Sequence, residues 1–337
     1  MKVLVTGGAG YIGSTICSAL KDVGHTPVIL DSLVTGQLAF TKGHIFYQGD
    51  IADKSLVDRI LREHPEIRLV VHCAALIVVP ESMEKPYEYY RENVSKSVEF
   101  FHTLVGHRIE GLVFSSSASI YDVVPQFKVT EQSPLNPQSP YARTKYMMEM
   151  VLRDFTTAYP LKAIALRYFN PIGADPKLRS GIHVREPSHV VGKLVDCARG
   201  KLAQFQITGV NWPTRDGSGL RDYIHVWDLA RAHVAALENF DSVFSNKKSS
   251  NEGYEVINLG TGNGVTVKEL VHSFETVFGK TLNKTEAPPR PGDNAGSFAS
   301  CDRALELLKW SAEKSIDDGI RDALRWGDSR KAILGYD

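Results

Sequence analysis

The sequence lacks any excess of charge of one sign, because its 337 residues carry 39 Lys and Arg against 39 Asp and Glu. A neutral chain has no basic surface field of the kind that attracts nucleic acid or an anionic membrane. It also lacks an apolar run near the roughly 20 residues that cross a bilayer, and glycines interrupt the apolar N-terminus too early for a signal peptide. We therefore expect no nucleic-acid partner and no membrane partner, and a small molecule instead.

Clusters of cysteine and histidine are lacking too. Only four cysteines occur in the chain, and none of them forms a C-x-x-C pair. His183, His189 and His225 stand apart, without an H-x-x-x-H spacing or a cluster of His and carboxylate. These spacings favour neither a zinc site nor a disulfide framework. No bound metal is expected, and a reducing cytoplasm fits the cysteine content best.

Short β-branched runs alternate with longer amphipathic segments from the first residues on, a pattern typical of βαβ units in a parallel sheet. The runs predict strands at 3–6, 27–31, 45–48, 69–72, 112–115 and 163–167. The segments between them predict helices at about 11–23, 54–64, 86–106 and 140–158. The expected fold class is α/β, with a Rossmann-like, doubly wound parallel sheet and a smaller α/β lobe at the C-terminal side.

The texture of the sequence changes after residue 167, where Pro and Gly become frequent and the strand and helix signals become short. We place a dinucleotide-binding Rossmann domain in 1–167 and the second lobe mainly in 168–337. A further strand expected at 254–259, with the apolar segment before it, indicates that the chain returns to the first domain. That domain therefore also receives about 224–262, and the two lobes are interleaved.

A glycine fingerprint marks the candidate cofactor site. Gly7, Gly10 and Gly13 form G-x-x-G-x-x-G directly after the first expected strand and at the start of a helix. Glycines there allow a tight turn and let backbone N–H groups approach a pyrophosphate at the helix N-terminus. Asp31 ends the next strand at the spacing expected for a carboxylate on the ribose hydroxyls, and its charge favours NAD over NADP. The alternative is that Asp31 begins a turn. Asp50, after the third strand, is placed near the adenine, caps a helix, or does both.

A serine run and a Tyr–Lys pair carry the candidate chemistry. Ser115, Ser116 and Ser117 follow an expected strand, and Tyr141 and Lys145 lie four residues apart on one face of an expected helix. A nearby cation lowers the pKa of a phenol from about 10 toward neutrality. The phenolate can then take a proton from a hydroxyl as hydride leaves the same carbon for a nicotinamide. The Tyr–Lys spacing alone is common in helices, but the glycine fingerprint and the serine run make it specific.

Segments spread over nearly the whole chain resemble one family. They read TGGAGYIG, SSSASIY, SPYARTK, RYFNPIGA, RDYIHVWDLA and INLGTG. These segments resemble the UDP-glucose 4-epimerase family of NAD-dependent extended short-chain dehydrogenases/reductases. The resemblance implies a reversible C4 epimerisation of a UDP-hexose, UDP-glucose or UDP-galactose, through a 4-keto intermediate. NAD would stay tightly bound and be regenerated in every cycle.

The resemblance also implies roles for individual residues. Tyr141 would be the catalytic base, Lys145 would tune it and hold the nicotinamide ribose, and Ser117 would hydrogen-bond the sugar O4. The implied cofactor-binding residues are Gly7, Gly10, Tyr11, Ile12, Gly13, Asp31, Asp50, Ile51, Ala74, Ala75, Asn93, Tyr141, Lys145 and Tyr168. The implied substrate-binding residues are Ser117, Tyr141, Phe169, Asn170, Arg221, Arg290, Asp293 and Ser297.

Two arginines in this set suit a diphosphate. Arg221 and Arg290 can clamp it with charge-assisted, fork-shaped hydrogen bonds. The alternatives are an ion pair between Arg221 and its neighbour Asp222, and a solvated loop charge at Arg290.

The chain departs from the family pattern in several loops. Ile77 stands where the family usually has a Lys that contacts the cofactor, and Asp122 follows Tyr121 where Gly is usual. Ser188 and His189 replace an Asn-rich stretch that contacts uridine. These departures concern the subclass and the nucleotide more than the fold.

The residue at position 297 bears on the sugar. Ser297 stands four residues after Asp293, where members confined to unmodified hexoses often have a bulky Tyr. A small residue leaves room for a 2-N-acetyl group. We therefore expect UDP-N-acetylglucosamine and UDP-N-acetylgalactosamine to be accepted as well.

Family likeness also implies a homodimer, in which the helices expected at 86–106 and 140–158 pair with their copies in a four-helix bundle.

Two alternative functions remain open. One is a nucleotide-sugar dehydratase or 4-keto reductase of the same superfamily. Ala118 and Ser119 stand where dehydratases commonly carry an Asp-Glu pair, which disfavours ordinary 4,6-dehydration, but Cys73 or Glu81 could supply other groups. The second alternative is a non-catalytic NAD-sensing protein, against which the intact Ser, Tyr and Lys argue.

Overall fold

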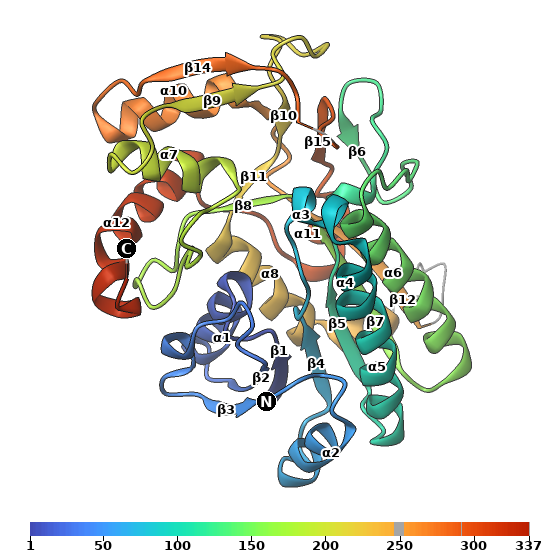
Figure 1. The fold of residues 1–337 in the computed structure, drawn as a ribbon. Helices are drawn as coiled ribbons and strands as arrows, with labels where there is room; N and C mark the ends of the chain where they lie inside the picture. The colour runs from blue at the N-terminus through green and yellow to red at the C-terminus, as the bar shows by residue number, and fades with distance from the viewer. Residues whose placement is uncertain (246–252, 291, 337) are drawn as a thin grey trace.

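The computed structural model describes residues 1–245, 253–290 and 292–336. Within them, seven parallel strands form one sheet in the order β12-β7-β5-β4-β1-β2-β3 (Figure 1). The strands are β1 (Lys2–Thr6), β2 (Thr26–Asp31), β3 (Ile45–Gln48), β4 (Leu69–His72), β5 (Gly111–Ser115), β7 (Lys162–Tyr168) and β12 (Tyr254–Leu259). The strand order reverses between β1 and β4, which makes the sheet doubly wound and confirms the predicted fold class.

Helices cover both faces of this sheet because successive strand residues point to opposite sides. In β1, Val3 and Val5 belong to the core on one face, whereas Leu4 belongs to the core on the other. The first face is covered by α1 (Tyr11–Asp22), α8 (Val226–Glu238), α9 (Phe240–Ser245) and α11 (Asp302–Leu308). The second face is covered by α2 (Lys54–Glu63), α5 (Lys96–Gly106) and α6 (Pro140–Ala158).

The strands predicted for this sheet are all present, with ends that differ by at most one residue. Their β-branched and aliphatic runs are buried on both faces, as in β2, where all residues after Thr26 are buried. The predicted strand at 254–259 is β12, which pairs with β7 over its whole length. The chain therefore returns to the first sheet after it has entered the second lobe.

The predicted helix at 86–106 is not one regular helix. After α3 (Val79–Glu84), the chain forms α4 (Pro86–Tyr90), then a π-helical turn, η2 (Arg91–Ser95), and only then α5. A π turn inserts one residue into the helical ladder and often lies at a functional site. Here it contains Asn93, whose side chain is buried and faces the loop after β4.

The second lobe consists of short strands that pack against three helices. Leu194, Phe274 and Ile320, one from each helix, join its hydrophobic core. The strands form three small sheets, with orders β13-β10-β15-β6, β11-β8 and β14-β9. Their bounds are β6 (Lys128–Val129), β8 (Asn170–Ile172), β9 (Phe205–Thr208), β10 (Leu220–Arg221), β11 (Tyr223–His225), β13 (Val265–Thr266), β14 (Lys284–Ala287) and β15 (Gly296–Ala299). The helices are α7 (Val190–Ala198), α10 (Val267–Phe278) and α12 (Ile316–Leu334).

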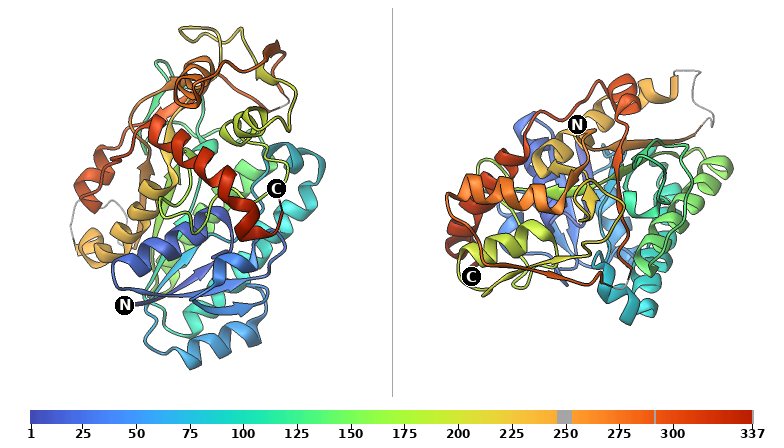
Figure 2. Two further views of the ribbon diagram at one scale, coloured as in Figure 1. Left: turned by 90° about the vertical axis from the view of Figure 1, so that its left-hand side faces the viewer. Right: turned by 90° about the horizontal axis from the view of Figure 1, so that it is seen from above.

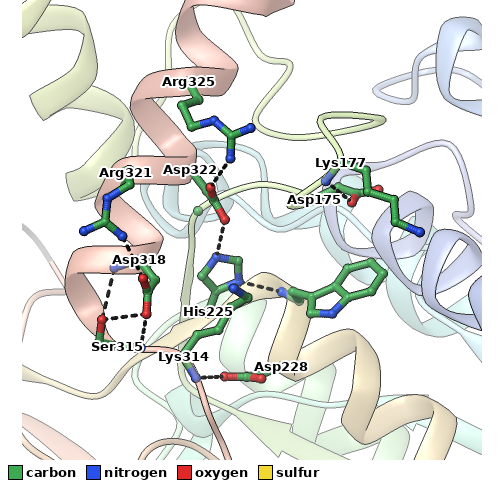
Figure 3. A network of polar contacts seen from close by, with 12 residues as sticks. Asp175, Lys177, His225, Asp228, Lys314, Ser315, Asp318, Arg321, Asp322 and Arg325 are labelled. Atoms are coloured by element: carbon green, nitrogen blue, oxygen red, sulfur yellow. Dashed lines mark hydrogen bonds and ion pairs between the residues drawn. The ribbon is translucent and has the colours of Figure 1, made fainter.

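A polar network joins α8, on the first sheet, to α12 of the second lobe (Figure 3). The backbone N–H of Trp227 donates to Nδ1 of His225 at 2.9 Å, and Nε2 of the same ring lies 3.3 Å from Oδ2 of Asp322. The N–H of Lys314 donates to Oδ2 of Asp228 at 2.8 Å. His225 thus caps a helix and pairs with a carboxylate, which explains this histidine without a metal.

The far end of α12 reaches the first lobe. Figure 2 shows α12 running across the second lobe, with its C-terminal part near the first. The ring of Trp326 lies 5.9 Å from that of Phe40, which belongs to the 3-10 helix η1 (Leu38–Thr41). His183, from the loop before α7, has Nε2 2.7 Å from the carbonyl oxygen of Thr35. The lobes are therefore in contact beside the end of β2 as well as at the network around His225.

No helix in the described ranges is long and apolar enough to cross a membrane.

Candidate active site

The carboxyl ends of the parallel strands form one edge of the sheet, and many of the predicted site residues lie along it. Gly7 follows β1, Asp31 ends β2, Ser117 follows β5 and Phe169 follows β7. Ligands of doubly wound sheets bind at this edge, in the crevice where the strand order reverses. The crevice here lies between β1 and β4. The fold therefore collects residues that are far apart in the sequence.

The glycine loop between β1 and α1 is packed too closely for other side chains. Gly7 has φ +70°, and a Cβ there would lie 2.7 Å from the backbone nitrogen of Ala74. A Cβ on Gly13 would lie 2.1 Å from the carbonyl oxygen of Gly7. Gly10 is the N-cap residue of α1. This geometry suits a pyrophosphate at the N-terminus of α1.

Tyr11 and Ile12 begin α1 directly after the glycine loop. The Tyr11 hydroxyl donates to the carbonyl oxygen of Gly173 at 2.7 Å, and burial raises its pKa. Ile12 packs against the core of the first face. Tyr11 therefore connects the loop to the second lobe, and a cofactor contact of either residue stays a prediction.

Asp31 organises the backbone around the glycine loop. Its Oδ2 accepts from the N–H of Ala9 at 2.9 Å, and its Oδ1 accepts from the N–H of Leu33 at 2.8 Å. The alternative that Asp31 begins a turn is thus part of what the residue does. An ionised carboxylate has about four acceptor positions, so two backbone bonds leave capacity for ribose hydroxyls. The ribose contact itself stays a prediction.

Asp50 lies in the loop after β3 and pairs with Lys96 of α5. Its Oδ2 accepts from Nζ of Lys96 at 2.5 Å, and its Oδ1 accepts from the N–H of Ala52 at 2.9 Å. Burial acts to raise the pKa of Asp50, but these two hydrogen bonds together hold it below its ordinary value. The N-cap of α2 is Asp53, so the alternative of a helix cap at Asp50 is wrong. Ile51 is buried in the core beside it.

Asn93 shapes the loop after β4. Its Oδ1 accepts from the N–H of Leu76 at 2.7 Å, and its Nδ2 donates to the carbonyl oxygen of Leu76 at 2.9 Å and to Oγ1 of Thr144 at 3.1 Å. Ala74 and Ala75 lie in the same loop, next to the glycine loop. Asn93 therefore acts on the loop that faces the crevice, whereas its direct contact with a cofactor stays a prediction.

Ser117, Tyr141 and Lys145 come together at the end of β5. Tyr141, a residue only 7% exposed, has its hydroxyl beside the side chain of Ser117, whose hydrogen bonding acts to lower the Tyr141 pKa. Oγ of Ser117 also lies 2.9 Å from Oγ of Ser119. Nζ of Lys145 donates to the carbonyl oxygen of Ser115 at 2.8 Å and lies 6.0 Å from the centre of the Tyr141 ring. The structure thus brings together the three residues predicted to be catalytic.

The electrostatics of this cluster differ from the expectation in one respect. Burial raises the pKa of Tyr141, and the hydrogen bond with Ser117 lowers it only in part. Burial also lowers the pKa of Lys145 to about 8, against a smaller opposing effect of Cys73. The expected lowering of the Tyr141 pKa toward neutrality is therefore not produced by the groups of this chain alone, because burial disfavours the phenolate.

Tyr168 ends β7, and Phe169 and Asn170 follow it; the three side chains have different surroundings. Tyr168 is buried, which raises its pKa, although a hydrogen bond with Ser115 opposes the shift. Phe169 packs in a small cluster that also includes residues of the loop after β5. Asn170 is exposed, and its N–H donates to the carbonyl oxygen of Asp222 at 3.0 Å. Of the three, only the side chain of Asn170 lies in the open.

Arg221 and Ser297 are cross-strand partners in the parallel pair β10 and β15. The guanidinium donates to the carbonyl oxygen of Leu220 at 2.7 Å and to those of residues 294 and 295 at 3.2 and 3.3 Å. The carboxylate of Asp222 accepts instead from Thr261, through its N–H at 2.8 Å and its hydroxyl at 2.7 Å. The alternative pairing of Arg221 with Asp222 is therefore wrong.

Arg290 and Asp293 form an ion pair within one loop. Nε and Nη2 of Arg290 each donate to the carboxylate of Asp293 at 3.1 Å, and the Arg290 N–H adds a bond of 3.0 Å. The arginine side chain is 44% exposed. Arg290 is therefore partly solvated, as the alternative of a loop charge expected, but it is also paired with Asp293.

Ile77 and His189, two of the residues that depart from the family pattern, are uncharged at neutral pH. Ile77 is exposed, and burial lowers the pKa of His189 to about 4, with the nearby His183 adding to the shift. His189 is also the N-cap residue of α7. Across the described residues, no group of three or more His, Cys, Asp or Glu is arranged to hold a metal ion.

One group beside the cluster was missed in the sequence. Oγ of Ser116 donates to the buried carboxylate of Glu149, which also binds Arg167. The available signal was helical spacing, because Glu149 stands four residues after Lys145 and eight after Tyr141.

A doubly wound sheet, a glycine loop at its switch point and a Ser–Tyr–Lys cluster at the strand ends together define an NAD-dependent enzyme of the short-chain dehydrogenase/reductase class. The glycine loop and Asp31 fit the pyrophosphate and ribose of that cofactor, since the loop leads into the N-terminus of α1 and the carboxylate keeps acceptor positions for hydroxyls.

Comparisons with known proteins narrow the class. The model of the NAD dependent epimerase/dehydratase family matches residues 3–260. The UDP-glucose 4-epimerase of Bacillus subtilis is 39% identical over 100% of this chain and 99% of its own length. The chain therefore belongs to the NAD dependent epimerase/dehydratase family and, within it, to the UDP-glucose 4-epimerase family, as the sequence resemblance implied.

Solved structures agree. The UDP-glucose 4-epimerase of Stenotrophomonas maltophila, with bound NAD and formylated UDP-arabinopyranose, superposes with a TM-score of 0.91 at 36% identity and covers 98% of this chain and 99% of its own. The enzyme of Bifidobacterium longum, in complex with NAD+ and UDP, superposes with a TM-score of 0.89 at 33% identity and covers 100% of both chains.

Proposed function

We propose that this chain interconverts UDP-glucose and UDP-galactose by reversible epimerisation at C4, with bound NAD. The observation that carries the proposal is the cluster of Ser117, Tyr141 and Lys145 at the end of β5. Lys145 lies one helical turn further along α6, and the glycine loop lies at the same edge of the sheet. The similarity to UDP-glucose 4-epimerases along the whole chain supports this assignment.

The three side chains have complementary roles in this reaction. NAD, when bound, supplies the acceptor and donor of hydride. Tyr141 takes the proton of the sugar O4 hydroxyl as C4 becomes a ketone, and Ser117 hydrogen-bonds the same oxygen. Once the keto sugar has turned its other face, Tyr141 returns the proton and the epimer leaves. The proton and the hydride are both recovered, so no redox equivalent is consumed.

Lys145 supplies positive charge beneath this pair. Its ammonium is fixed by the carbonyl oxygen of Ser115, and with a pKa of about 8 it is charged at neutral pH. Positive charge favours the phenolate of Tyr141 against the effect of burial. We also assign Lys145 to the nicotinamide ribose.

We assign the rest of the cofactor to the crevice between β1 and β4. Gly7, Gly10 and Gly13 would hold the pyrophosphate, and Asp31 the adenosine ribose. The residues assigned to the other parts of the cofactor are Tyr11, Ile12, Asp50, Ile51, Ala74, Ala75, Asn93 and Tyr168.

We assign the UDP-sugar to the side of the second lobe. Arg221, Arg290 and Asp293 would contact the diphosphate and ribose, and Phe169 and Asn170 would line the sugar pocket. Ser297 lies beside Arg221 in the strand register, so a small side chain at this position enlarges the pocket next to the diphosphate. We therefore propose that UDP-N-acetylhexosamines are substrates too.

The test is to incubate the protein with UDP-galactose and, separately, with UDP-N-acetylgalactosamine, and to follow the anomeric protons by NMR. The expected result is the gluco epimer at equilibrium, with no net NADH. A keto or unsaturated product would indicate the dehydratase or reductase alternative, and no turnover with retained NAD would indicate the sensing alternative. Ser297→Tyr tests the pocket: we expect it to lower the rate with the N-acetylated sugar and to spare the other.

We also propose a homodimer that pairs through α4, α5 and α6. Its support is apolar surface on this side, where Met83, Tyr87 and Met150 are exposed. Sedimentation equilibrium should give twice the chain mass, and Tyr87→Lys should shift the balance toward monomer. A monomeric wild-type protein would contradict the proposal.

The domain division and the location of the protein are proposals of the same kind. Pairing of β12 with β7 supports a first domain of 1–167 that also receives about 224–262, with the second lobe mainly in 168–337. Cysteines that are free rather than bridged support a cytoplasmic location.

A further inference from the structure

The three consecutive serines after β5 make three different sets of contacts. Oγ of Ser115 lies 3.1 Å from Sγ of the half-buried Cys73 and 3.1 Å from Nε2 of the buried His233, which are both uncharged at neutral pH. Ser117 belongs to the catalytic cluster. Ser116, between them, donates to Oε1 of Glu149 at 2.5 Å. Ser116 is therefore the serine of this run whose hydroxyl binds a buried carboxylate.

That charge is one half of a buried ion pair. Nε of Arg167 donates to Oε1 of Glu149 at 2.9 Å, and Nη2 donates to Oε2 at 2.6 Å. The side chains are only 1% and 3% exposed. Nη1 of Arg167 donates further to the hydroxyl of Tyr121 at 2.9 Å, and that hydroxyl donates to Oδ1 of Asn258 at 2.7 Å. The guanidinium is thus bonded on each of its three nitrogens.

Stability alone does not account for such a pair. The cost of removing two charges from water cancels much of their attraction, and well-packed apolar residues often replace a buried ion pair without loss of stability. What apolar residues cannot replace is direction, because a two-point contact between a carboxylate and a guanidinium fixes the relative orientation of its elements.

The elements that this pair joins are those of the proposed reaction. Glu149 lies on α6, two helical turns from Tyr141 and one from Lys145. Ser116 is the neighbour of Ser117, and Arg167 on β7 directly precedes Tyr168. One carboxylate thus connects the helix that carries the base, the turn that carries the serine, and the strand end that leads into the sugar pocket.

We propose that Glu149 and Arg167 are positioning residues of the epimerase, and that through Ser116 they hold the hydroxyls of Ser117 and Tyr141 at the distance that proton transfer requires. The inference rests on the proposed function. Neither residue touches the sugar in this scheme. Because displacement of a reacting group by about 1 Å can cost on the order of a hundredfold in rate, we expect the network to act on kcat and to leave substrate binding nearly unchanged.

The test compares three variants in kcat and KM for UDP-galactose. Ser116→Ala removes only the hydroxyl link and no charge. The double variant Glu149→Leu with Arg167→Met replaces the pair by apolar side chains. The control is Glu255→Leu with Arg303→Met, which removes another ion pair whose glutamate is buried, near the amino end of β12 and so at the opposite edge of the sheet.

We expect kcat to fall about tenfold in Ser116→Ala and about a hundredfold in the double variant, with KM within about threefold and the control unchanged. The pH profile of kcat should also move to higher pH in Ser116→Ala, because the hydrogen bond that lowers the Tyr141 pKa is weakened. A purely structural role would lower kcat only in proportion to the loss of folded protein and would not move the pH profile.

The proposal is overturned if Ser116→Ala keeps its kcat and its pH profile, or if the control variant loses kcat to the same extent as the Glu149–Arg167 double variant. Should the double variant fail to fold, Ser116→Ala decides alone. A wild-type protein that does not epimerise the sugar contradicts the proposed function instead, so the two failures are distinguishable.

Discussion

The proposed cofactor site at the crevice and the proposed diphosphate site around Arg221 are built by different means. At the crevice, close-packed glycine backbone and two N–H groups fixed on Asp31 set the shape. At β10 and in the loop before β15, the proposed binding groups are the long side chains of Arg221 and Arg290, which already have partners of their own. The first site is built in advance, whereas the second must exchange contacts when a ligand enters.

The exchange at the second site differs between its two arginines. In the pair of Arg290 and Asp293 the arginine side chain is 44% exposed, and an ion pair open to water contributes only about 0–1 kcal/mol. Arg221 is half-buried and donates to backbone carbonyls, which also fix its direction. We infer that Arg221 gives affinity and that Arg290 adds a contact that depends on salt.

The largest expected effect is at the junction of the two sites. Tyr141→Phe should lower kcat by about a thousandfold, because it removes the group that carries the proton. The NAD content of the purified protein should stay unchanged, since the crevice is built without this hydroxyl. Tyr146→Phe, on the same helix, is the matched control, and comparable losses in both variants would contradict the assigned role.

The second-largest effect is expected from a variant that disrupts only the glycine loop of the cofactor site. Gly13→Ala places a Cβ 2.1 Å from the carbonyl oxygen of Gly7, so the loop must shift. We expect NAD to bind about a hundredfold more weakly, as 1–3 kcal/mol of overpacking implies, with the UDP affinity nearly unchanged. Gly106→Ala, where the added Cβ meets nothing within 4 Å, is the control for titration calorimetry. Equal loss of UDP binding would show that the two sites are not separable in this way.

Variants of Arg221 and Arg290 should change KM less than Gly13→Ala changes NAD binding, and the two arginines should differ in the size of their effect. Arg221→Met is expected to raise KM for UDP-galactose about tenfold to thirtyfold, because it removes hydrogen bonds to a charged group. We expect only a small change in kcat. Arg290→Met should raise KM only about threefold and should remove part of its dependence on salt. Arg215→Met, which breaks a surface pair with Glu269, serves as control in the same steady-state assay. The comparison fails if Arg290 proves the more important of the two.

The smallest effect concerns the interior beneath the crevice. Burial, aided by the charge of Lys145, lowers the pKa of His72 to about 3, and burial lowers that of His233 to about 4. Between pH 6.5 and about 4 the unfolded chain binds these protons and the folded chain does not, so the free energy of unfolding falls as the pH falls. Each histidine contributes up to about 1.4 kcal/mol per pH unit. Urea titrations at pH 7.5 and 5.5 measure the slope, and His72→Gln should reduce it by about a third, since His189 contributes as His233 does. An unchanged slope in that variant would exclude His72 as a source.

The sheet and the catalytic cluster could be predicted from the sequence because their signals are local. Runs such as those of β2 and β7 are buried on both faces and therefore carry no polar alternation. The Tyr–Lys spacing fixes a common helix face wherever the helix lies. Both kinds of signal need no knowledge of distant residues.

The remaining parts depend on contacts that local patterns do not contain. Ser297 lies beside Arg221 only because of the register between β10 and β15. These strands have two and four residues, which is too short for an alternating pattern to reveal them in the sequence. The π turn around Asn93 looks like ordinary helix in sequence, since its cause includes contacts with the loop at Leu76. Helix caps compete at Asp50 and Asp53, and the structure selects the second.

The late position of β12 has a consequence for synthesis of the protein. Its partner β7, buried apart from its first residue, is complete at Tyr168, but β12 ends only at Leu259, roughly 90 residues later. At translation rates of about 5–20 residues per second, that delay lasts on the order of 5–20 s. During this interval the nascent chain exposes an apolar, unpaired strand edge of the kind that other chains can extend. Chaperone binding and slowed translation should therefore matter most while residues 169–259 are being made.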